Sequence, residues 1–386
     1  MSNGYLISIL TVGNRCVIRQ NRFVHHSLGD ILWAASILIM LSLLVTNCRK
    51  SASSQPPDDI DTTSNVVSWR TDTIGVVNSE IHDIAIIDDN NIWAVGAIYL
   101  RDSSGNIDQT VYNLLRWDGN QWNPQRLYVN FNGTQYIRMG LAVFAFTAND
   151  IWISCDVPEH WDGQRLNNVD FGGTDIGEVH RMWGRSSNDL YTAGSNGKFS
   201  HYDGTSFRAV TTGVQSWFWD VFGIGDVVYL GSYNYDNQIE PSGVFVHDTK
   251  GFRFLFPNAS DTTNFRALQN CFGVWASPQG TLWTVTPGFV YRPMVTHAAA
   301  YSVSANGSLR SLICIRGLSD SDVWAGGAGG LVVHYNGASW REHPALASGP
   351  FYIEYHCIAV KGNTIVLGGT SLNFEHAVVT LGRRGK

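Results

Sequence analysis

The chain has 386 residues, a formal net charge of −6 and only 15% charged residues, whereas glycine (39) and tryptophan (14) are abundant. A net negative charge gives no basic surface of the kind that binds nucleic acid, and the high content of aromatic and aliphatic residues excludes a largely disordered chain. Low charge with many aromatic residues and glycines is typical of short, buried β-strands joined by tight turns.

The N-terminal segment has the pattern of an export signal. Residues 31–45 (ILWAASILIMLSLLV) are apolar apart from two serines, and this run is short for a membrane span. Basic residues precede it at Arg15, Arg19 and Arg22. The run ends in VTNC, which resembles the lipobox of bacterial lipoproteins, so that Cys48 stands where the acylated cysteine would be. Asn47 departs from the Gly, Ala or Ser that normally precedes that cysteine.

Alternatives stay open for this segment. Either residues 1–48 are a lipoprotein signal with Cys48 as the lipidation site, or residues 31–47 remain as a signal anchor; a true start nearer the apolar run is also compatible with the sequence. Residues 49–63 are small, polar and proline-containing, as expected of a flexible linker. Both routes place the body, residues 64–386, outside the cytoplasm, in the cell envelope, periplasm or extracellular space.

The body contains one unit repeated seven times. Its first anchor is a turn followed by an apolar residue, an aromatic residue, two further residues and often glycine. The copies centre on Trp93, Trp152, Tyr191, Tyr229, Trp283, Trp324 and, with an aliphatic residue instead, Val366. A period of about 40 residues predicts one four-stranded propeller blade per copy. The predicted fold class is therefore all-β, a seven-bladed β-propeller.

A second anchor follows most copies, with an aromatic residue, Asp or Asn, Gly, two residues and another aromatic residue. It occurs at residues 117–122 (WDGNQW), 202–207 (YDGTSF) and 335–340 (YNGASW), and in weaker form at 161–163 and 247–252. Asp-Gly and Asn-Gly favour tight hairpin turns because glycine adopts positive φ without steric cost. We expect this turn between the third and fourth strands, with its aromatic residues packed between blades.

The seventh copy, residues 355–381, supplies only three strands. Residues 68–70 (SWR) repeat residues 339–341 (SWR), which form the expected fourth strand of the sixth copy. We therefore predict that residues 66–72 complete the last blade, so that an N-terminal strand closes the ring and removes exposed sheet edges.

On the Trp-x-x-Gly and aromatic-Asp-Gly-x-x-Trp anchors, residues 64–386 resemble the propellers of secreted bacterial proteins, in the group that includes Asp-box and photosystem-assembly-factor-like propellers. The Ser and Thr of the full Asp-box (Ser-x-Asp-x-Gly-x-x-Thr-Trp) are not kept, so the motif is degenerate and carries no sialidase assignment. Together with the lipobox-like segment, the resemblance implies an exported β-propeller repeat lipoprotein. Such a fold does not by itself determine a function.

Three copies begin their first strand with Glu-x-His, at Glu80 and His82, Glu178 and His180, and Glu354 and His356. Residues two apart on a strand share a face, so each glutamate is expected beside its histidine. Because the first strand is the innermost of a blade, the pairs are predicted at the mouth of the central channel. Blades seven and one are neighbours, which brings His356 towards His82. Trp219 and Asp220 fall in the same region of the fourth copy.

Two interpretations of this column remain. In the first, the mouth binds a ligand: a divalent metal held by His82, His180 and His356, or an anionic or sugar ligand that uses the glutamates, Asp220 and Trp219. In the second, the pairs only form a polar, water-filled entrance and Trp219 packs in the core. No cofactor other than such a metal is expected.

The sequence has no nucleophile elbow, phosphate-binding glycine loop or zinc-type spacing. We therefore expect no catalytic residues, and a monomeric, membrane-tethered binding or scaffold module for a protein or glycan. Insertions at residues 99–111 and 233–244 would enlarge one rim of it. The alternative is a propeller-type glycan hydrolase or lyase with acids and histidines at the mouth. Four cysteines are expected to be buried free thiols: Cys155, Cys271, Cys314 and Cys357.

Overall fold

The computed structural model describes residues 2–12, 15–25, 64–131, 134–233, 242–255, 270–293, 298–302, 304–305, 308–309, 311–343, 352–371 and 374–385. The chain divides into two compact units, Met1–Ile60 and Asp61–Lys386. In the first unit, β1 (Ser2–Val12) and β2 (Arg15–His25) form an antiparallel hairpin. The apolar run, Cys48 and the linker lie outside the described residues. No helix within the described ranges is long and apolar enough to cross a membrane.

The second unit consists of seven four-stranded antiparallel sheets, which are the blades. Blade 1 contains β4 (Glu80–Asp88), β5 (Asn91–Ile98), β6 (Tyr112–Trp117) and β7 (Trp122–Gln125). Blade 2 contains β10 (Ala142–Thr147), β11 (Asp150–Ser154), β12 (Pro158–Trp161) and β13 (Leu166–Asn168). Blade 3 contains β14 (Val179–Ser186), β15 (Asp189–Gly194), β16 (Phe199–Tyr202) and β17 (Phe207–Ala209).

Blade 4 contains β18 (Trp217–Ile224), β19 (Val227–Tyr233), β20 (Val244–Asp248) and β21 (Gly251–Phe254). Blade 5 contains β22 (Gly273–Ala276), β23 (Leu282–Thr286), β24 (Phe289–Pro293) and β25 (Ala298–Ser302). Blade 6 contains β28 (Leu312–Ser319), β29 (Asp322–Gly327), β30 (Val332–Tyr335) and β31 (Trp340–Glu342). Blade 7 contains β32 (Ile353–Lys361), β33 (Thr364–Ser371), β34 (Ala377–Arg384) and β3 (Val67–Ile74). Two short hairpins accompany the blades, β8 (Val129–Phe131) with β9 (Thr134–Tyr136), and β26 (Ser304–Ala305) with β27 (Ser308–Leu309).

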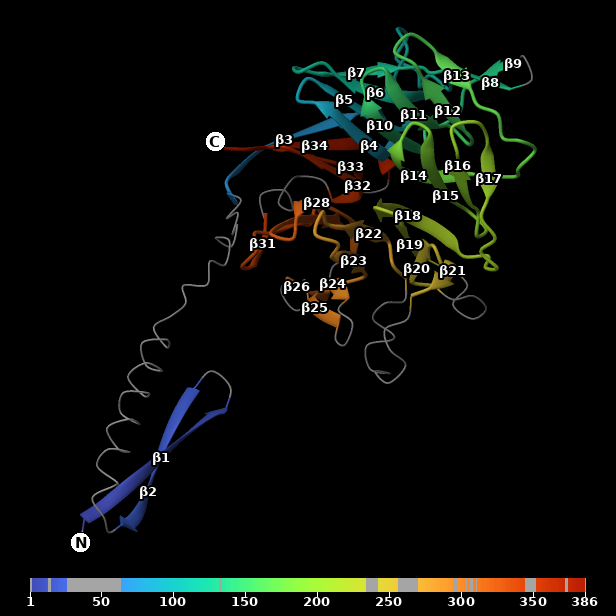
Figure 1. Ribbon diagram of the computed structural model, residues 1–386. Coiled ribbons are helices and arrows are strands. Elements are labelled where there is room, and N and C mark those ends of the chain that lie inside the picture. The colour runs from blue at the N-terminus through green and yellow to red at the C-terminus, as the bar shows by residue number, and fades with distance from the viewer. Residues whose placement is uncertain are drawn as a thin grey trace. The chain divides into compact units, whose positions relative to one another are not determined.

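The first strand of each blade contacts the first strand of the next, and β32 contacts β4, so the seven blades close into a ring (Figure 1). The predicted seven-bladed β-propeller is thereby confirmed. Because all seven blades share one strand order, their first strands run in the same direction around a central channel. Their N-terminal ends form one face of the ring, which carries Glu80, Glu178 and Glu354 and is called the mouth face. Their C-terminal ends, including Lys361, form the opposite or exit face.

An N-terminal strand closes the last blade, as predicted from the repeated SWR. The strand β3 pairs with β34 from Val67 opposite Arg384 to Ile74 opposite Ala377, and the two lie side by side in Figure 1. The indole of Trp69 packs edge-on against Trp324 of blade 6, with ring centroids 6.0 Å apart. It leaves no space for a side chain at position 382 of β34, where an added Cβ would lie 2.5 Å from the ring. Position 382 therefore requires glycine.

The Asp-Gly and Asn-Gly turns connect the third and fourth strands, as predicted. Gly119 and Gly337 adopt φ of +97° and +90°. The side-chain oxygen of the preceding Asp or Asn caps the turn: Asp118 Oδ1 accepts hydrogen bonds from the backbone N–H groups of Asn120 and Gln121, both at 2.9 Å. Each such turn holds two strands in one register.

Aromatic residues of the repeat fill the spaces between blades. Trp152 of blade 2 packs on Tyr202 and Phe207 of blade 3. Trp283 of blade 5 meets Tyr335 and Trp340 of blade 6 in the same way. The predicted inter-blade packing is confirmed, and the four expected free cysteines are buried thiols without disulfides.

Candidate functional site

The three Glu-x-His pairs lie at the mouth as predicted, with each histidine next to its own glutamate. The Nε2 atom of His82 is 3.0 Å from a carboxylate oxygen of Glu80; the corresponding distances are 3.5 Å for His180 and Glu178 and 3.6 Å for His356 and Glu354. Each histidine occupies a β-bulge, because the ladder to the second strand skips that one residue. A bulge re-aims the side chain that it contains.

His82 is held by two acceptors. Its Nδ1 atom lies 2.7 Å from the carbonyl oxygen of Gly140 in the neighbouring blade, which can only accept a hydrogen bond. Its Nε2 atom faces the carboxylate of Glu80. Both ring nitrogens therefore face acceptors, and the contact with Gly140 joins the first strand of blade 1 to blade 2.

His180 is in a different electrostatic environment. Burial, with further contributions from the charges of Arg181 and His82, lowers the pKa of His180 to about 4. The imidazole is therefore neutral at neutral pH, and its Nε2 atom makes no hydrogen bond within the described structure. Glu178, whose side chain is 44% exposed, consequently has no cationic histidine beside it.

The two other glutamates are influenced by nearby histidines. For Glu80, burial opposes ionisation, but the hydrogen bond from His82 and the charges of His82 and His356 hold its pKa below the ordinary value. The hydrogen bond from His356 is the largest cause that lowers the pKa of Glu354. His356 of blade 7 thus lies close enough to Glu80 of blade 1 to influence its pKa.

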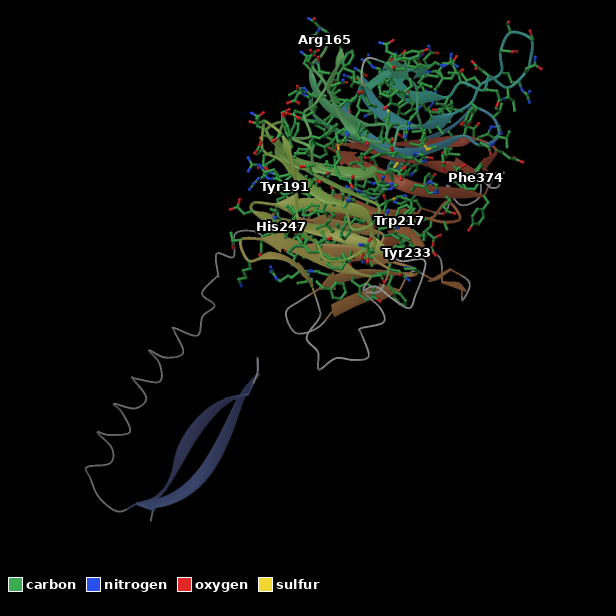
Figure 2. All side chains as sticks on the ribbon, turned by 90° about the vertical axis from the view of Figure 1, so that its right-hand side faces the viewer. Arg165, Tyr191, Trp217, Tyr233, His247 and Phe374 are labelled. Carbon is green, nitrogen blue, oxygen red and sulfur yellow. The ribbon has the colours of Figure 1, made fainter. Side chains whose placement is uncertain are left out.

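Aromatic side chains form the opposite part of the mouth, over blades 3 to 5, and are called the aromatic arc: His180, Trp217, Trp219, Tyr233 and Phe272. Trp217 is stacked against His180, with centroids 5.8 Å apart and planes at 25°, and Tyr233 is stacked on Phe272 at 4.9 Å. Trp217 and Tyr233 are cross-strand partners of β18 and β19 and are labelled in Figure 2. Trp217 is 38% exposed, whereas Phe218 between the two indoles is 1% exposed. The exposed indole is thus Trp217 rather than Trp219, whose Nε1 atom is buried.

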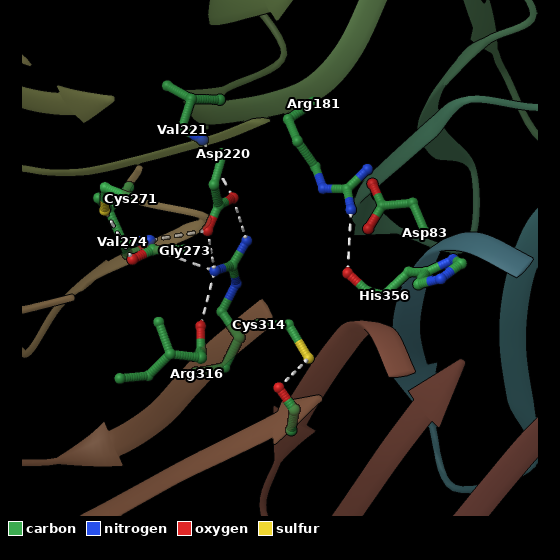
Figure 3. Close-up of polar contacts among 12 residues, drawn as sticks. Asp83, Arg181, Asp220, Val221, Cys271, Gly273, Val274, Cys314, Arg316 and His356 are labelled. Carbon is green, nitrogen blue, oxygen red and sulfur yellow. Dashed lines mark hydrogen bonds and ion pairs between the residues drawn. The ribbon is translucent and has the colours of Figure 1, made fainter. Parts of the chain in front are cut away.

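Below the mouth, an ion pair crosses the channel between blades 4 and 6. The guanidinium of Arg316 donates two hydrogen bonds of 2.8 Å to the two carboxylate oxygens of Asp220 (Figure 3). Asp220 also accepts the backbone N–H groups of Val221 and Val274, at 3.0 Å each, and its side chain is almost fully buried. The predicted mouth residue Asp220 therefore ties blades 4, 5 and 6 together.

Asp83 occupies the matching position in blade 1. It accepts the N–H groups of Ile84 and Val143, which lie in blades 1 and 2. Figure 3 shows the guanidinium of Arg181 next to it, but Arg181 donates to the carbonyl oxygens of His180 and His356. Burial raises the pKa of Asp83 in spite of the charge of Arg181 and these backbone hydrogen bonds.

These polar groups divide the channel into two ends. Towards the exit face, a cavity of about 280 Å³ lies between apolar side chains and the guanidinium groups of Arg181 and Arg316. On the mouth face, a second cavity of about 450 Å³ extends outward from the channel between blades 1, 2 and 3. Glu178 and Leu141 line this second cavity at the end that adjoins the mouth.

Loop residues form the rest of the mouth-face cavity. Its walls include Tyr99, Thr110 and Val111 from the predicted insertion of blade 1, and Met139 and Asp156 from blade 2. Asp156 adopts φ of +118°, a strained conformation for a residue other than glycine, and forms an ion pair with Arg138. Strained residues of this kind concentrate at functional sites. The second predicted insertion falls largely outside the described residues, since residues 234–241 are not among them.

No group of three or more His, Cys, Asp or Glu side chains in the described ranges is arranged to hold a metal ion. His82, His180 and His356 are each directed to a separate acceptor or aromatic neighbour instead. The column and its glutamates were predictable from the sequence, whereas of the two indoles in β18 the exposed one is Trp217 and not the predicted Trp219. Arg316 was not predicted, although an arginine in the apolar first strand of the sixth copy is a signal for it.

No protein-family model and no curated protein sequence matches the chain. Solved structures are similar in fold. The structure of YCF48 bound to a D1 peptide matches with a TM-score of 0.59 and 14% identity, covering 84% of this chain and 99% of that one. A catalytically inactive virginiamycin B lyase from Staphylococcus aureus, with quinupristin, matches with a TM-score of 0.53 and 11% identity over 82% of this chain and 99% of that one.

The extracellular domain of the putative one-component system BT4673 from B. thetaiotaomicron matches with a TM-score of 0.50 and 16% identity, covering 80% of this chain and 39% of that one. At such low identities, similarity extends to the fold and not to the residues of a site. The comparisons and the strand topology agree that the chain is a seven-bladed β-propeller.

Proposed function

We propose that this protein is a non-enzymatic binding module that takes a segment of another protein on its mouth face. The observation that carries the proposal is the aromatic arc, in which the exposed Trp217 lies beside a half-exposed carboxylate and a cavity of about 450 Å³. Rigid aromatic side chains next to a concave surface are the usual anchors of protein recognition. The similar propeller YCF48, solved bound to a D1 peptide, adds support from the fold.

A selection from a random peptide display library on the full chain tests this proposal. Enriched peptides should bind in fluorescence anisotropy, and Trp217→Ala should weaken them about tenfold, because a central aromatic anchor dominates such interfaces. Leu318→Ala is the matched control, since Leu318 is an exposed apolar residue (37%) at the end of β28 on the exit face. Binding to a glycan array without any peptide binding, or peptide affinity unchanged by Trp217→Ala, would overturn the proposal.

We also propose that the protein is exported and held at a membrane in the cell envelope. The support is the sequence of the N-terminal segment, in which an apolar run leads to Cys48. Labelling with a fatty-acid analogue in a bacterial host should mark the wild-type protein and not Cys48→Ser. A membrane-bound protein without label favours the signal anchor, and a protein recovered only from the cytoplasm contradicts export.

A further inference from the structure

The cavity of about 280 Å³ in the channel, called the exit cavity, opens on the exit face, where Lys361 lines it. Towards the mouth the channel narrows to a space of only about 10 Å³, whose lining includes Asp83, Arg181, Asp220 and Arg316 (Figure 3). Such a space holds one water molecule. A ligand therefore enters the exit cavity from the exit face and meets these charged side chains at its inner end.

The guanidinium of Arg181 has unused donors at this inner end. It donates one hydrogen bond to the carbonyl oxygen of His180, at 2.8 Å, and one to that of His356, at 3.3 Å. A guanidinium has five N–H groups. The other three make no hydrogen bond within the described part of the chain, and no ion pair joins Arg181 to the neighbouring Asp83 (Figure 3).

The carboxylates at the inner end already hold donors. The two oxygens of Asp83 accept the backbone N–H groups of Ile84, at 3.0 Å, and Val143, at 3.1 Å. Those of Asp220 accept the guanidinium of Arg316, at 2.8 Å each. A polar ligand group that reaches this end of the exit cavity thus meets free side-chain donors rather than free side-chain acceptors.

The balance of charge also favours an anion. Arg181, Arg316 and Lys361 line the exit cavity, against Asp83 in its lining and Asp220 behind Arg316, which gives three positive charges and two negative ones. The Nζ atom of Lys361, at the open end, donates to the carbonyl oxygen of Ile87 at 2.9 Å. A cation at the entrance attracts an anion, and charge-assisted hydrogen bonds from a guanidinium hold it.

The walls between the entrance and the inner end are apolar. Phe222 lines the exit cavity between Trp183 and Trp275, with ring centroids 6.1 Å and 6.3 Å away, and Ile358 lines it from blade 7. A ligand with an apolar body buries this surface, whereas a hydrated inorganic ion does not. Since one water occupies about 30 Å³, the volume corresponds to about nine waters, or a molecule of about ten non-hydrogen atoms.

We propose that the exit cavity binds a small organic monocarboxylate, whose carboxylate accepts hydrogen bonds from Arg181 and whose apolar body lies against Phe222. One charge is expected because only one guanidinium at the inner end lacks a carboxylate partner within the described residues. The site goes beyond the proposed function, because it lies at the opposite end of the channel from the aromatic arc.

Isothermal titration calorimetry on the full chain with phenylacetate tests this inference. Phenylacetate should bind at one site per chain. Acetate, which lacks the ring, and phenylacetamide, which lacks the charge, should each bind at least about tenfold more weakly. Absence of phenylacetate binding, or an equal affinity for acetate, would overturn the inference.

The role of Arg181 is tested by substitution. Arg181→Gln should weaken phenylacetate binding by about tenfold or more and leave phenylacetamide binding unchanged. Arg185→Gln is the matched control, because Arg185 lies in the same strand, is 37% exposed and pairs with Asp189 and Asp226. It should have little effect. Equal losses in the two variants would show a general attraction of anions to the exit face and would overturn the assigned site.

A crystallographic measurement on the wild type does not depend on the stability of a variant. In crystals soaked with 4-bromophenylacetate, anomalous scattering should place the bromine beside Phe222 and the carboxylate at Arg181. A bromine ordered only at another site, or no ordered bromine at a concentration that saturates the protein in calorimetry, would overturn the inference. Binding of peptides at Trp217 is measured separately, so that either proposal can fail without the other.

Discussion

The guanidinium of Arg384, in the last strand, lies 2.7 Å from both carboxylate oxygens of Asp322 in blade 6, and both side chains are almost fully buried. Asp322 also accepts hydrogen bonds from the Trp324 indole at 2.8 Å and faces His334 at 3.1 Å. The C-terminal end of the chain is thus linked to the preceding blade as well as to β3.

Replacing Arg384 should reveal the strength of that link. Arg384→Gln leaves Asp322 buried without its guanidinium partner, and we expect a loss of about 3–5 kcal/mol in the free energy of unfolding. Urea denaturation monitored by tryptophan fluorescence measures it. Arg341→Gln, a change of the same kind at an exposed site in blade 6, should stay within about 0.5 kcal/mol. Equal effects of the two variants would contradict the argument.

Removal of the closing strand is a second test of the same region. A chain lacking residues 64–72 loses most of β3, and with it the contact between Trp69 and Trp324 and six of the eight positions paired with β34. We expect a large fall in the melting temperature, because β34 becomes an exposed edge and the Trp324 side of blade 6 loses its cover. An unchanged melting temperature in this truncation would show that the ring does not depend on its N-terminal strand.

The two channel aspartates should differ in their contribution to stability. Asp220→Asn removes the countercharge of Arg316, and a loss of about 3–5 kcal/mol is expected. Asp83→Asn should cost less, about 1–2 kcal/mol, because Asp83 serves mainly as a hydrogen-bond acceptor for two backbone N–H groups and burial raises its pKa. Chemical denaturation of the pair gives the comparison, and a larger loss for Asp83→Asn would contradict the assignment.

Acid should destabilise the propeller through His343. Burial, with the neighbouring charges of His334 and Arg341, lowers the pKa of His343 to about 4, and the residue is 8% exposed. At pH values between about 6.5, the ordinary pKa of histidine, and about 4, the imidazole is protonated in the unfolded chain but neutral in the folded one. The free energy of unfolding therefore falls as the pH falls through this range, by up to about 3 kcal/mol.

The variant His343→Phe tests this pH dependence. Phenylalanine keeps a ring against Trp324, which His343 stacks on at 5.3 Å, but cannot titrate. The difference in unfolding free energy between pH 7 and pH 4.5 should become smaller than in the wild type. It should not vanish, because burial also lowers the pKa of His180 and of His247. An identical pH dependence in the variant would exclude His343 as a source.

The architecture was predictable because the signals that specify it are local and recur. Each blade repeats an anchor aromatic residue and an Asp-Gly or Asn-Gly turn, and the tripeptide around Trp69 matches the one around Trp340. Pairing between the two ends of the chain followed from that match, although some 310 residues separate Thr71 from Thr380, whose hydroxyl groups lie 2.9 Å apart. The repeated tripeptide thus predicted a contact between segments that lie far apart in the sequence.

The charges of the site were not predictable in the same way. Glu80, Glu178 and Glu354 have the same sequence context, but the neutrality of His180 depends on burial and on Arg181. Likewise, regular alternation places Trp217 and Trp219 on one face of β18, but packing leaves Trp217 as the exposed indole and buries the Nε1 atom of Trp219. Such effects depend on packing between blades, which a repeat pattern does not encode.

The position of β3 also determines how this protein can be handled. Because β32, β33, β34 and β3 alternate in direction, Val67 and Arg384 lie together on the exit face, and the Gly385 N–H group is 3.2 Å from the carbonyl oxygen of Val66. A biotin tag, fluorophore or sensor-chip attachment at either end of the propeller would therefore leave the surface around Trp217 accessible. A short linker between residues 385 and 66 would likewise allow circular permutants with new ends in a turn.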